Sequence, residues 1–285
     1  MPSILTTVLH HPARRARCLE NVLSSLSEAT VHPHHVEVIV QGPIDVTKRT
    51  LPRGSDFPGI ELCYIMLPEN VGVAPAVQLT LTRLDEEQHH THWAKIDDDV
   101  TFEPGAFDKV LDQMAFEDDL GEHRVGYVMI SMPGLRPFLW KESFDGTGSP
   151  SIIKKIGSYG TRELKGMRWH VCDLTEIGCT LFTREALLHC RPDPHYRYGM
   201  DNFDLMWQMT LAGYKTILSE SPGCYSSGKG ECDTPEYIAD ARPAYPPDLY
   251  RDYFRQKWGL DIPPINRSCP RSLAKKYKVP PKQLR

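Results

Sequence analysis

The 285-residue sequence has no long apolar run, no Cys-x-x-Cys pair and no excess of basic charge. A membrane-spanning helix needs about 20 consecutive apolar residues. The apolar stretch 4–9 is short and runs into His10, His11 and Pro12, so we expect neither a membrane span nor a signal peptide. The 33 basic and 37 acidic residues give a net charge of -4, which argues against a binder of duplex nucleic acid.

Eight cysteines in a chain of this length are too few for a disulfide scaffold. Several stand in apolar stretches, for example Cys63 and Cys179, where a buried free thiol packs as a small hydrophobic side chain. We therefore expect reduced thiols and a cytoplasmic location. Histidines gather at 32–35 and 89–92, in polar turns without cysteine partners, which favours solvated loop histidines over a zinc site.

Strand-like and helix-like segments alternate over the first 130 residues. Apolar runs predict strands at 4–9, 36–40, 62–67, 92–96 and 125–130. Apolar residues at helical spacing lie between them, for example Leu19, Val22, Leu23 and Leu26. This alternation predicts an α/β fold with a mostly parallel, doubly wound (Rossmann-like) sheet and flanking helices. Ligands of such sheets bind at the carboxyl ends of the strands.

The periodicity is lost over residues 133–167, where glycines are mixed with serine, lysine and arginine. A loop of that length in a compact domain is usually functional or disordered, so we expect a long irregular flap over a site, with a plain surface insertion as the alternative. For Trp140 and Trp169, which border this stretch, we expect core or flap positions, with stacking on a sugar ring as the alternative. The segment 267–285 contains basic residues but no acidic ones, which is typical of a solvated tail; the alternative is contact with an anionic acceptor or a membrane surface.

Three consecutive carboxylates, Asp97, Asp98 and Asp99, follow the predicted strand 92–96. Adjacent like charges repel each other unless a cation or solvent compensates them. Carboxylate oxygens suit Mg²⁺ or Mn²⁺, either of which can bridge to a diphosphate. The alternative is an acidic cluster that is favoured by the dipole of the next helix.

Two further segments lie at predicted helix starts. The segment 68–76 has Asn70 and Gly72 in a strand-to-helix turn, followed by small residues on the first helical turn, where a ligand can approach the backbone and the free N–H groups of the helix start can receive an anion. Asp201 precedes the helical stretch 203–211, and a poorly hydrated carboxylate there can have a raised pKa and act as a general base. Its alternative role is to cap the helix.

Taken in order, these pieces resemble the family 2 glycosyltransferases with the GT-A fold. The resemblance covers most of the chain, through the segments 4–26, 70–74, the DXD-type triplet 97–99, 178–185, the acidic helix 201–214 and the K-W-G ending of 253–259. It implies transfer of a sugar from a nucleoside-diphosphate sugar, with a UDP-sugar favoured, to an unidentified acceptor hydroxyl. Mn²⁺ or Mg²⁺ is the implied cofactor, inversion the implied stereochemistry, and a homodimer one assembly to consider.

The resemblance also assigns residues and domains. The donor-binding residues are Gln41, Asp45, Asn70, Gly72, Asp97 and Asp98. Asp97 and Asp99 are the metal ligands, and the catalytic carboxylates are Asp201, as the base, and Asp204. Gly178 and Cys179 line the acceptor side. The domains are a GT-A domain over 1–230, with a donor half 1–130 and an acceptor half 131–230, and a Pro-rich, C-terminally basic extension over 231–285.

Two positions depart from the family's pattern. Asn202 stands where many relatives have the second acid of a pair, so either Asp201 is the base or no base is needed there. Many metal-dependent relatives have a histidine after the strand predicted at 216–218, and this chain has none there. Lys229 is the candidate that neutralises the diphosphate instead.

Two other functions stay open. A nucleotidyltransferase usually has a Gly-rich phosphate loop near the N-terminus, but the turn 10–15 contains no glycine. A degenerate, non-catalytic binder of nucleotides or sugars with the same fold is consistent with Asn202 and the missing histidine.

Overall fold

The computed structural model describes residues 1–42, 51–130, 136–144, 150–175, 179–197, 201–220, 224–226, 232–237 and 247–260. The chain divides into two compact units. The larger comprises Met1–Leu139 and Ile156–Tyr245, and the smaller Trp140–Lys155 and Pro246–Arg285. The boundary expected at residue 230 stays a prediction.

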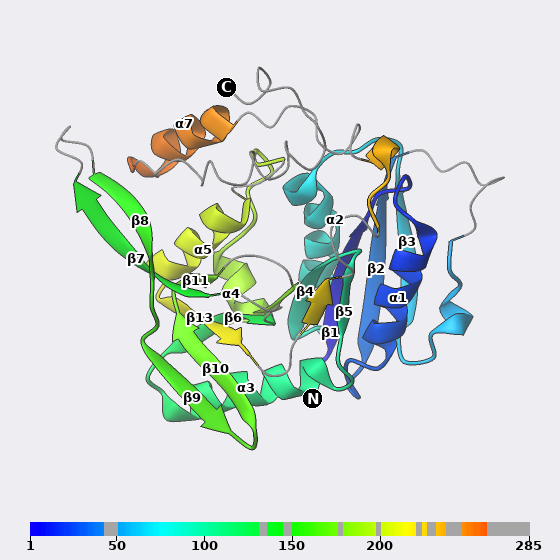
Figure 1. Ribbon diagram of the computed structural model, residues 1–285, viewed down its shortest axis with the longest axis horizontal. Helices are drawn as coiled ribbons and strands as arrows, with labels where there is room; N and C mark the ends of the chain where they lie inside the picture. Colours follow the sequence, from blue (N-terminus) through cyan, green and yellow to red (C-terminus); the bar gives the residue numbers. More distant parts are fainter. Residues whose placement is uncertain are drawn as a thin grey trace. The chain divides into compact units, whose positions relative to one another are not determined.

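A nine-stranded mixed sheet forms the centre of the larger unit, in the order β3-β2-β1-β4-β12-β6-β13-β10-β9 (Figure 1). Its strands are β1 (Ile4–His10), β2 (His34–Gln41), β3 (Glu61–Leu67), β4 (His92–Asp97), β6 (Arg124–Ile130), β9 (Gly160–Leu164), β10 (Met167–Cys172), β12 (Cys179–Thr183) and β13 (Tyr214–Ser219). Strands β10 and β12 run opposite to all the others in this sheet. The predicted α/β fold with a mostly parallel sheet is confirmed.

Helices cover both faces of the sheet because each has an apolar stripe. They are α1 (Ala16–Ser27), α2 (Val73–Glu86), α3 (Ala106–Leu120), α4 (Arg184–His189) and α5 (Asp201–Leu211). The stripes of α1 and α3 share one buried cluster with Ile4 and Val8 of β1. Leu5 lies between these two positions and is buried on the opposite face, where α2 packs against β1.

The remaining elements are short or lie near the segments that the structure leaves out. They are η1 (Gly54–Asp56), β5 (Val100–Phe102), β7 (Pro137–Phe144), β8 (Pro150–Ile156), β11 (Leu174–Thr175), β14 (Cys224–Ser226) and α7 (Pro247–Trp258). Strand β14 pairs antiparallel with β5, next to the aspartate triplet. Among the helices in the described ranges, none is long and apolar enough to cross a bilayer.

The stretch 133–167 is not the irregular loop that we expected, since its described residues form β7, β8 and β9. Along β9, exposed residues alternate with partly buried ones, as they do on an edge strand with one face in water. Because these strands contain polar residues and are separated by glycines, their sequence has no apolar run. A role for this stretch as a flap stays a prediction.

Trp169 does not stack on a sugar, because its ring is fully buried in the core cluster. Its Nε1–H donates a hydrogen bond to Glu117 Oε1 at 2.7 Å, and its ring packs edge-on against Phe116. The expected core position of Trp169 is therefore confirmed and its sugar-stacking alternative is wrong, whereas the role of Trp140 stays a prediction.

The two histidine clusters are less solvated than expected. His34, His35 and His90 are buried, because the segments that precede β2 and β4 pack together at the amino ends of the strands. The prediction that all these histidines lie in water is wrong.

The expectation of reduced thiols is also wrong for one pair. Cys18 of α1 and Cys232 form a disulfide across a sequence separation of 214 residues. The disulfide attaches the segment 232–237 to α1, and the hydrogen bond from Thr234 Oγ1 to the carbonyl of Ala13, 2.6 Å long, adds to this attachment. Free thiols in the described ranges are those of Cys63, Cys172, Cys179, Cys190 and Cys224.

Loss of the disulfide should destabilise the protein, because it removes a restraint on the unfolded chain. For Cys18→Ser we expect the free energy of unfolding to fall by about 2–4 kcal/mol in non-reducing urea titrations. The partly exposed Cys63 is the control, and Cys63→Ser should change the free energy of unfolding little. Wild-type stability in Cys18→Ser, or peptide maps of oxidised protein without a Cys18–Cys232 link, would contradict the assignment.

Candidate active site

The carboxyl ends of β1, β2 and β4 border a cleft of about 360 Å³. Strand β1 pairs with β2 on one side and with β4 on the other, so the strand order reverses here. Open α/β sheets bind their ligands at such a switch point. The cleft is lined by Leu9, His10, His11, Arg14, Gln41, Asn70, Gly72, Val73, Lys95, Asp97, Asp98, Asp99, Asp201, Asn202 and Tyr237.

Most of the predicted site residues meet in this cleft. They are Gln41, Asn70, Gly72, Asp97, Asp98, Asp99 and Asp201. Asp204 is fully buried within α5 instead, where its Oδ2 accepts a hydrogen bond from Gln208 Nε2 at 2.7 Å. Cys179 is buried at the start of β12. Asp45, Gly178 and Lys229 lie outside the described residues.

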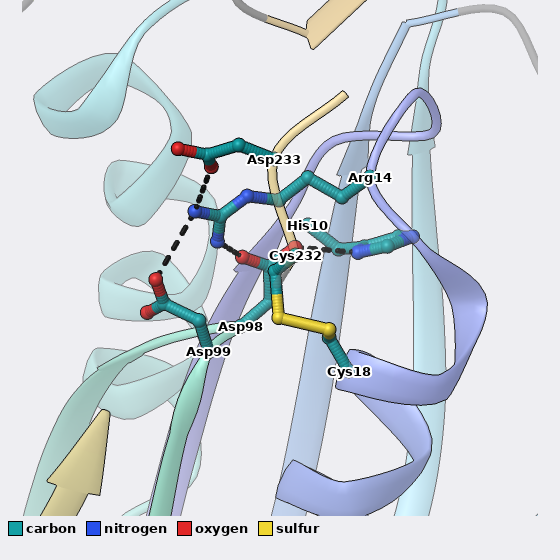
Figure 2. Close-up of a disulfide and its surroundings, with 7 residues drawn as sticks. All are labelled: His10, Arg14, Cys18, Asp98, Asp99, Cys232 and Asp233. Atoms are coloured by element: carbon teal, nitrogen blue, oxygen red, sulfur yellow. Dashed lines mark hydrogen bonds and ion pairs between the residues drawn. A yellow bond between two sulfur atoms is a disulfide. The ribbon is translucent and has the colours of Figure 1, made fainter. Parts of the chain in front are cut away.

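Arg14 binds two residues of the aspartate triplet, Asp98 and Asp99 (Figure 2). Its guanidinium donates to Asp98, to Asp99 Oδ2 at 3.1 Å and to Asp233 Oδ1 at 3.0 Å. On the other side of Asp98, His10 Nδ1 lies 2.6 Å from Oδ2. Asp98 is only 2% exposed, so both of its oxygens bind protein groups away from water.

These contacts shift the pKa values of Asp98 and Asp99 in opposite directions. Burial alone would raise the pKa of Asp98, but the hydrogen bond with His10 and the charge of Arg14 outweigh it and lower the pKa. Burial raises the pKa of Asp99, against the opposing charge of Arg14 and with support from the neighbouring Asp97 and Asp98. Asp98 is therefore the stable counter-ion of Arg14.

Lys95 connects the triplet to the start of α5. Its Nζ donates to Asp97 Oδ1 at 3.2 Å. Burial alone would lower the pKa of Lys95, but the charges of Asp97 and Asp201 outweigh it, so the pKa is raised and the ammonium group stays charged. Asp97 has the most open side chain of the triplet, with 46% of its surface exposed.

Asp201 is a buried carboxylate at the first position of α5, with 5% of its surface exposed. Burial raises its pKa, and the charge of Lys95 and a hydrogen bond from the Asn202 backbone oppose the shift only in part. A carboxyl group with a raised pKa beside a fixed cation can accept a proton at a pH where Asp98 cannot.

The turn before α2 is fixed by its own hydrogen bonds. Gln41 Oε1 accepts from the backbone N–H groups of Val71 and Gly72, both at 3.2 Å. The N–H group of Val73 donates to the carbonyl of Arg197 at 2.7 Å. These three N–H groups are therefore engaged within the protein, and an anion site on the first turn of α2 stays a prediction.

Gly72 is required by the same packing. Its φ is +95°, and a Cβ atom there would lie 2.4 Å from the carbonyl oxygen of Arg197. Any other residue would force the turn away from Arg197 and move Asn70 at the edge of the cleft.

Several cleft residues were not found from the sequence. Lys95 had a usable signal, since a lysine between Ala94 and Ile96 interrupts a buried strand. Arg14 lies in the turn after β1, which the sequence marks only by its lack of glycine. Asp233 and Tyr237, whose ring lies 4.5 Å from the Arg14 guanidinium, come from beyond the expected domain boundary and have no local signal.

The triplet does not by itself form a complete metal centre. Within the described residues, the group of three potential ligands that converges is Glu87, His89 and His90. Mg²⁺ is usually held by one or two carboxylates together with substrate phosphates. Asp97 has an exposed carboxylate of this kind, whereas Asp99 Oδ2 is bound to Arg14, and the metal role of this pair stays a prediction.

The sequence matches no protein-family model and no curated protein. The structure is similar to GalNAc-T7 solved with UDP, GalNAc and Mn²⁺, with a TM-score of 0.56, 11% identity and coverage of 98% of this chain. It is also similar to S. aureus TarS 1-349 in complex with UDP-GlcNAc, with a TM-score of 0.53, 14% identity and 87% coverage. The fold is the GT-A glycosyltransferase fold. The chain covers 55% and 63% of the lengths of those two GT-A structures.

Neutralising Asp98 should unfold the site. In Asp98→Asn, Arg14 stays buried without its main counter-charge, which costs about 3–5 kcal/mol of unfolding free energy at neutral pH. The exposed Asp112→Asn is the control, and urea titration measures both. Because the pKa of Asp98 is lowered, wild type should keep this stabilisation at neutral pH and lose it only as the pH falls through that lowered pKa. Equal stability of Asp98→Asn and wild type at neutral pH would refute the anchoring role.

Proposed function

We propose that the protein is a glycosyltransferase of the family 2 type, which transfers a sugar from a nucleoside-diphosphate sugar to an acceptor hydroxyl. The observation that supports this most is the meeting of Asp97, Lys95 and the buried Asp201 at the switch point of a GT-A sheet. The ligands named for GalNAc-T7 and TarS favour a UDP-sugar as the donor.

Asp201 is the general base in this proposal. Its raised pKa brings the carboxylate nearer to the pH of the reaction, where proton acceptance is effective. Asp201 takes the proton of the acceptor hydroxyl while the hydroxyl oxygen attacks the anomeric carbon. The bond from that carbon to the diphosphate oxygen breaks, and attack from the opposite face inverts the configuration. The charge of Lys95 limits the rise in the pKa of Asp201, and its Nζ holds Asp97 in position.

A divalent cation is part of the proposal because the cations of the cleft are already paired. Among its described lining residues, Arg14 and Lys95 both bind carboxylates. The diphosphate therefore needs another positive charge, for which Lys229, outside the described residues, stays one candidate. Asp97 and Asp99 are the residues that would hold Mn²⁺ or Mg²⁺. When bound, the cation offsets the charge that develops on the departing diphosphate.

The other predicted residues have defined places in the proposal. Gln41, Asn70 and Gly72 shape the donor side of the cleft, and Asp98 acts through Arg14. Residues 1–130 form the donor half and 131–230 the acceptor half. Asp233 and Tyr237 extend the donor half into the segment that follows residue 230.

Replacement of the proposed base tests this function without knowledge of the acceptor. With water as acceptor, wild type should release UDP from one of a panel of UDP-sugars, and the rate should rise with pH as Asp201 loses its proton. Asp201→Asn should lower turnover roughly 10²–10⁴-fold. The donor affinity and the melting temperature of Asp201→Asn should equal those of wild type, because the neutral amide replaces a buried charge.

The outcomes separate three cases. The exposed Asp112→Asn should leave turnover unchanged. Turnover of Asp201→Asn equal to that of wild type would refute the base assignment. Donor binding by wild type without any UDP release would favour the non-catalytic binder, for which Asn202 is the sequence argument.

A further inference from the structure

A second cavity, of about 490 Å³, lies at the amino ends of the same strands. Ser3 precedes β1 and His34 opens β2, so this cavity is at the opposite edge of the sheet from the candidate active site. Five of its lining residues are histidines, namely His32, His34, His35, His89 and His90.

Three potential metal ligands meet where α2 ends. Glu87 is the residue after α2, and its Oε2 lies 3.1 Å from His90 Nε2 and 3.8 Å from His89 Nε2. All three ligand atoms lie within 4.8 Å of one another. In a tetrahedral site with bonds of about 2.0–2.1 Å, neighbouring ligand atoms are roughly 3.4 Å apart. One cation can therefore reach all three after small side-chain movements.

The surrounding residues orient two of these ligands. His90 is 2% exposed, and its Nδ1 lies 3.1 Å from Ser3 Oγ, which leaves Nε2 to face Glu87. A metal-binding histidine usually has its second ring nitrogen fixed in this way. Arg83 Nε donates to the other oxygen of Glu87, Oε1, at 2.7 Å, so Oε2 is the oxygen turned to the histidines. The charge of Arg83 opposes a cation, but its NH1 is paired with Glu37 Oε1 at 2.7 Å.

A separate observation comes from His35, which lines the same cavity. It is 7% exposed, and in the described residues its Nε2 has no hydrogen-bond partner. The ring of His35 lies 6.0 Å from that of His90. A buried ring nitrogen without a partner is costly unless something else binds it. His35 therefore adds an unpartnered ring nitrogen to the lining of the cavity that contains the three converging ligands.

We propose that Glu87, His89 and His90 form a site for a divalent transition-metal cation, with Zn²⁺ as the reference ion. Two imidazoles and one carboxylate suit such ions, and water or His35 can complete the coordination. The site is structural, because its ligands fix the loop between α2 and β4, and His90 of that loop also contacts Ser3 Oγ before β1. The start of α2 lines the cleft, but the site does not depend on the proposed glycosyl transfer.

Isothermal titration calorimetry with Zn²⁺ on the chelator-treated full chain tests the proposal. Wild type should bind Zn²⁺, and its melting temperature should rise as the Zn²⁺ concentration rises. His89 is exposed, so His89→Ala should fold normally and lower the zinc affinity at least about tenfold. The exposed His189→Ala is the matched control and should bind as wild type does.

A second measurement separates this site from the carboxylates of the cleft. Co²⁺ bound through histidine nitrogens gives a visible absorption band, which should be present in Asp99→Ala and lost in His89→Ala. Failure of wild type to bind Zn²⁺, or equal zinc affinity in His89→Ala and wild type, would overturn the proposal.

Discussion

The buried ion pair between Arg14 and Asp98 is the contact on which the rest of the cleft depends. Three adjacent aspartates at the end of β4 would repel each other, and Arg14 offsets that repulsion by binding two of them. The same guanidinium binds Asp233, which the disulfide between Cys18 and Cys232 keeps nearby. A buried charge that loses its partner destabilises the folded state strongly. The contacts that shape the cleft therefore also stabilise the carboxyl edge of the sheet.

The carboxylates of the cleft consequently differ in what they can do, although all of them are aspartates. Asp98 is held between Arg14 and His10 with a lowered pKa and cannot take up a proton near neutrality. Asp97 is open to the cleft and bound by Lys95, which suits an oxygen ligand for a donor-bound cation. Asp201 is buried with a raised pKa and is the group suited to accept a proton. Burial and the nearest cation, rather than residue type, set these roles.

The sequence was sufficient for features that depend on local pattern. Apolar runs predicted β1 to β4 and β6, and a carboxylate triplet after a strand had to lie at the ligand-binding edge of the sheet. It was insufficient where distant segments meet. The disulfide and the contact of Asp233 with Arg14 join residues more than 200 positions apart. The polar edge strand β9 had no apolar run, and the burial of His90 depends on Ser3. Asp204 was assigned by resemblance alone, and its side chain faces Gln208 within α5.

Donor binding is the central claim, and a thermal-shift panel of nucleoside diphosphates and their sugars, each with Mn²⁺, Mg²⁺ or EDTA, tests it most directly. A ligand present at a hundred times its dissociation constant adds about 2.7 kcal/mol to the stability of the folded state. We predict a clear shift with one base, UDP being favoured, that is strengthened by the metal and loses that metal dependence in Asp99→Ala. The absence of a shift with every nucleotide, with and without metal, would contradict the account.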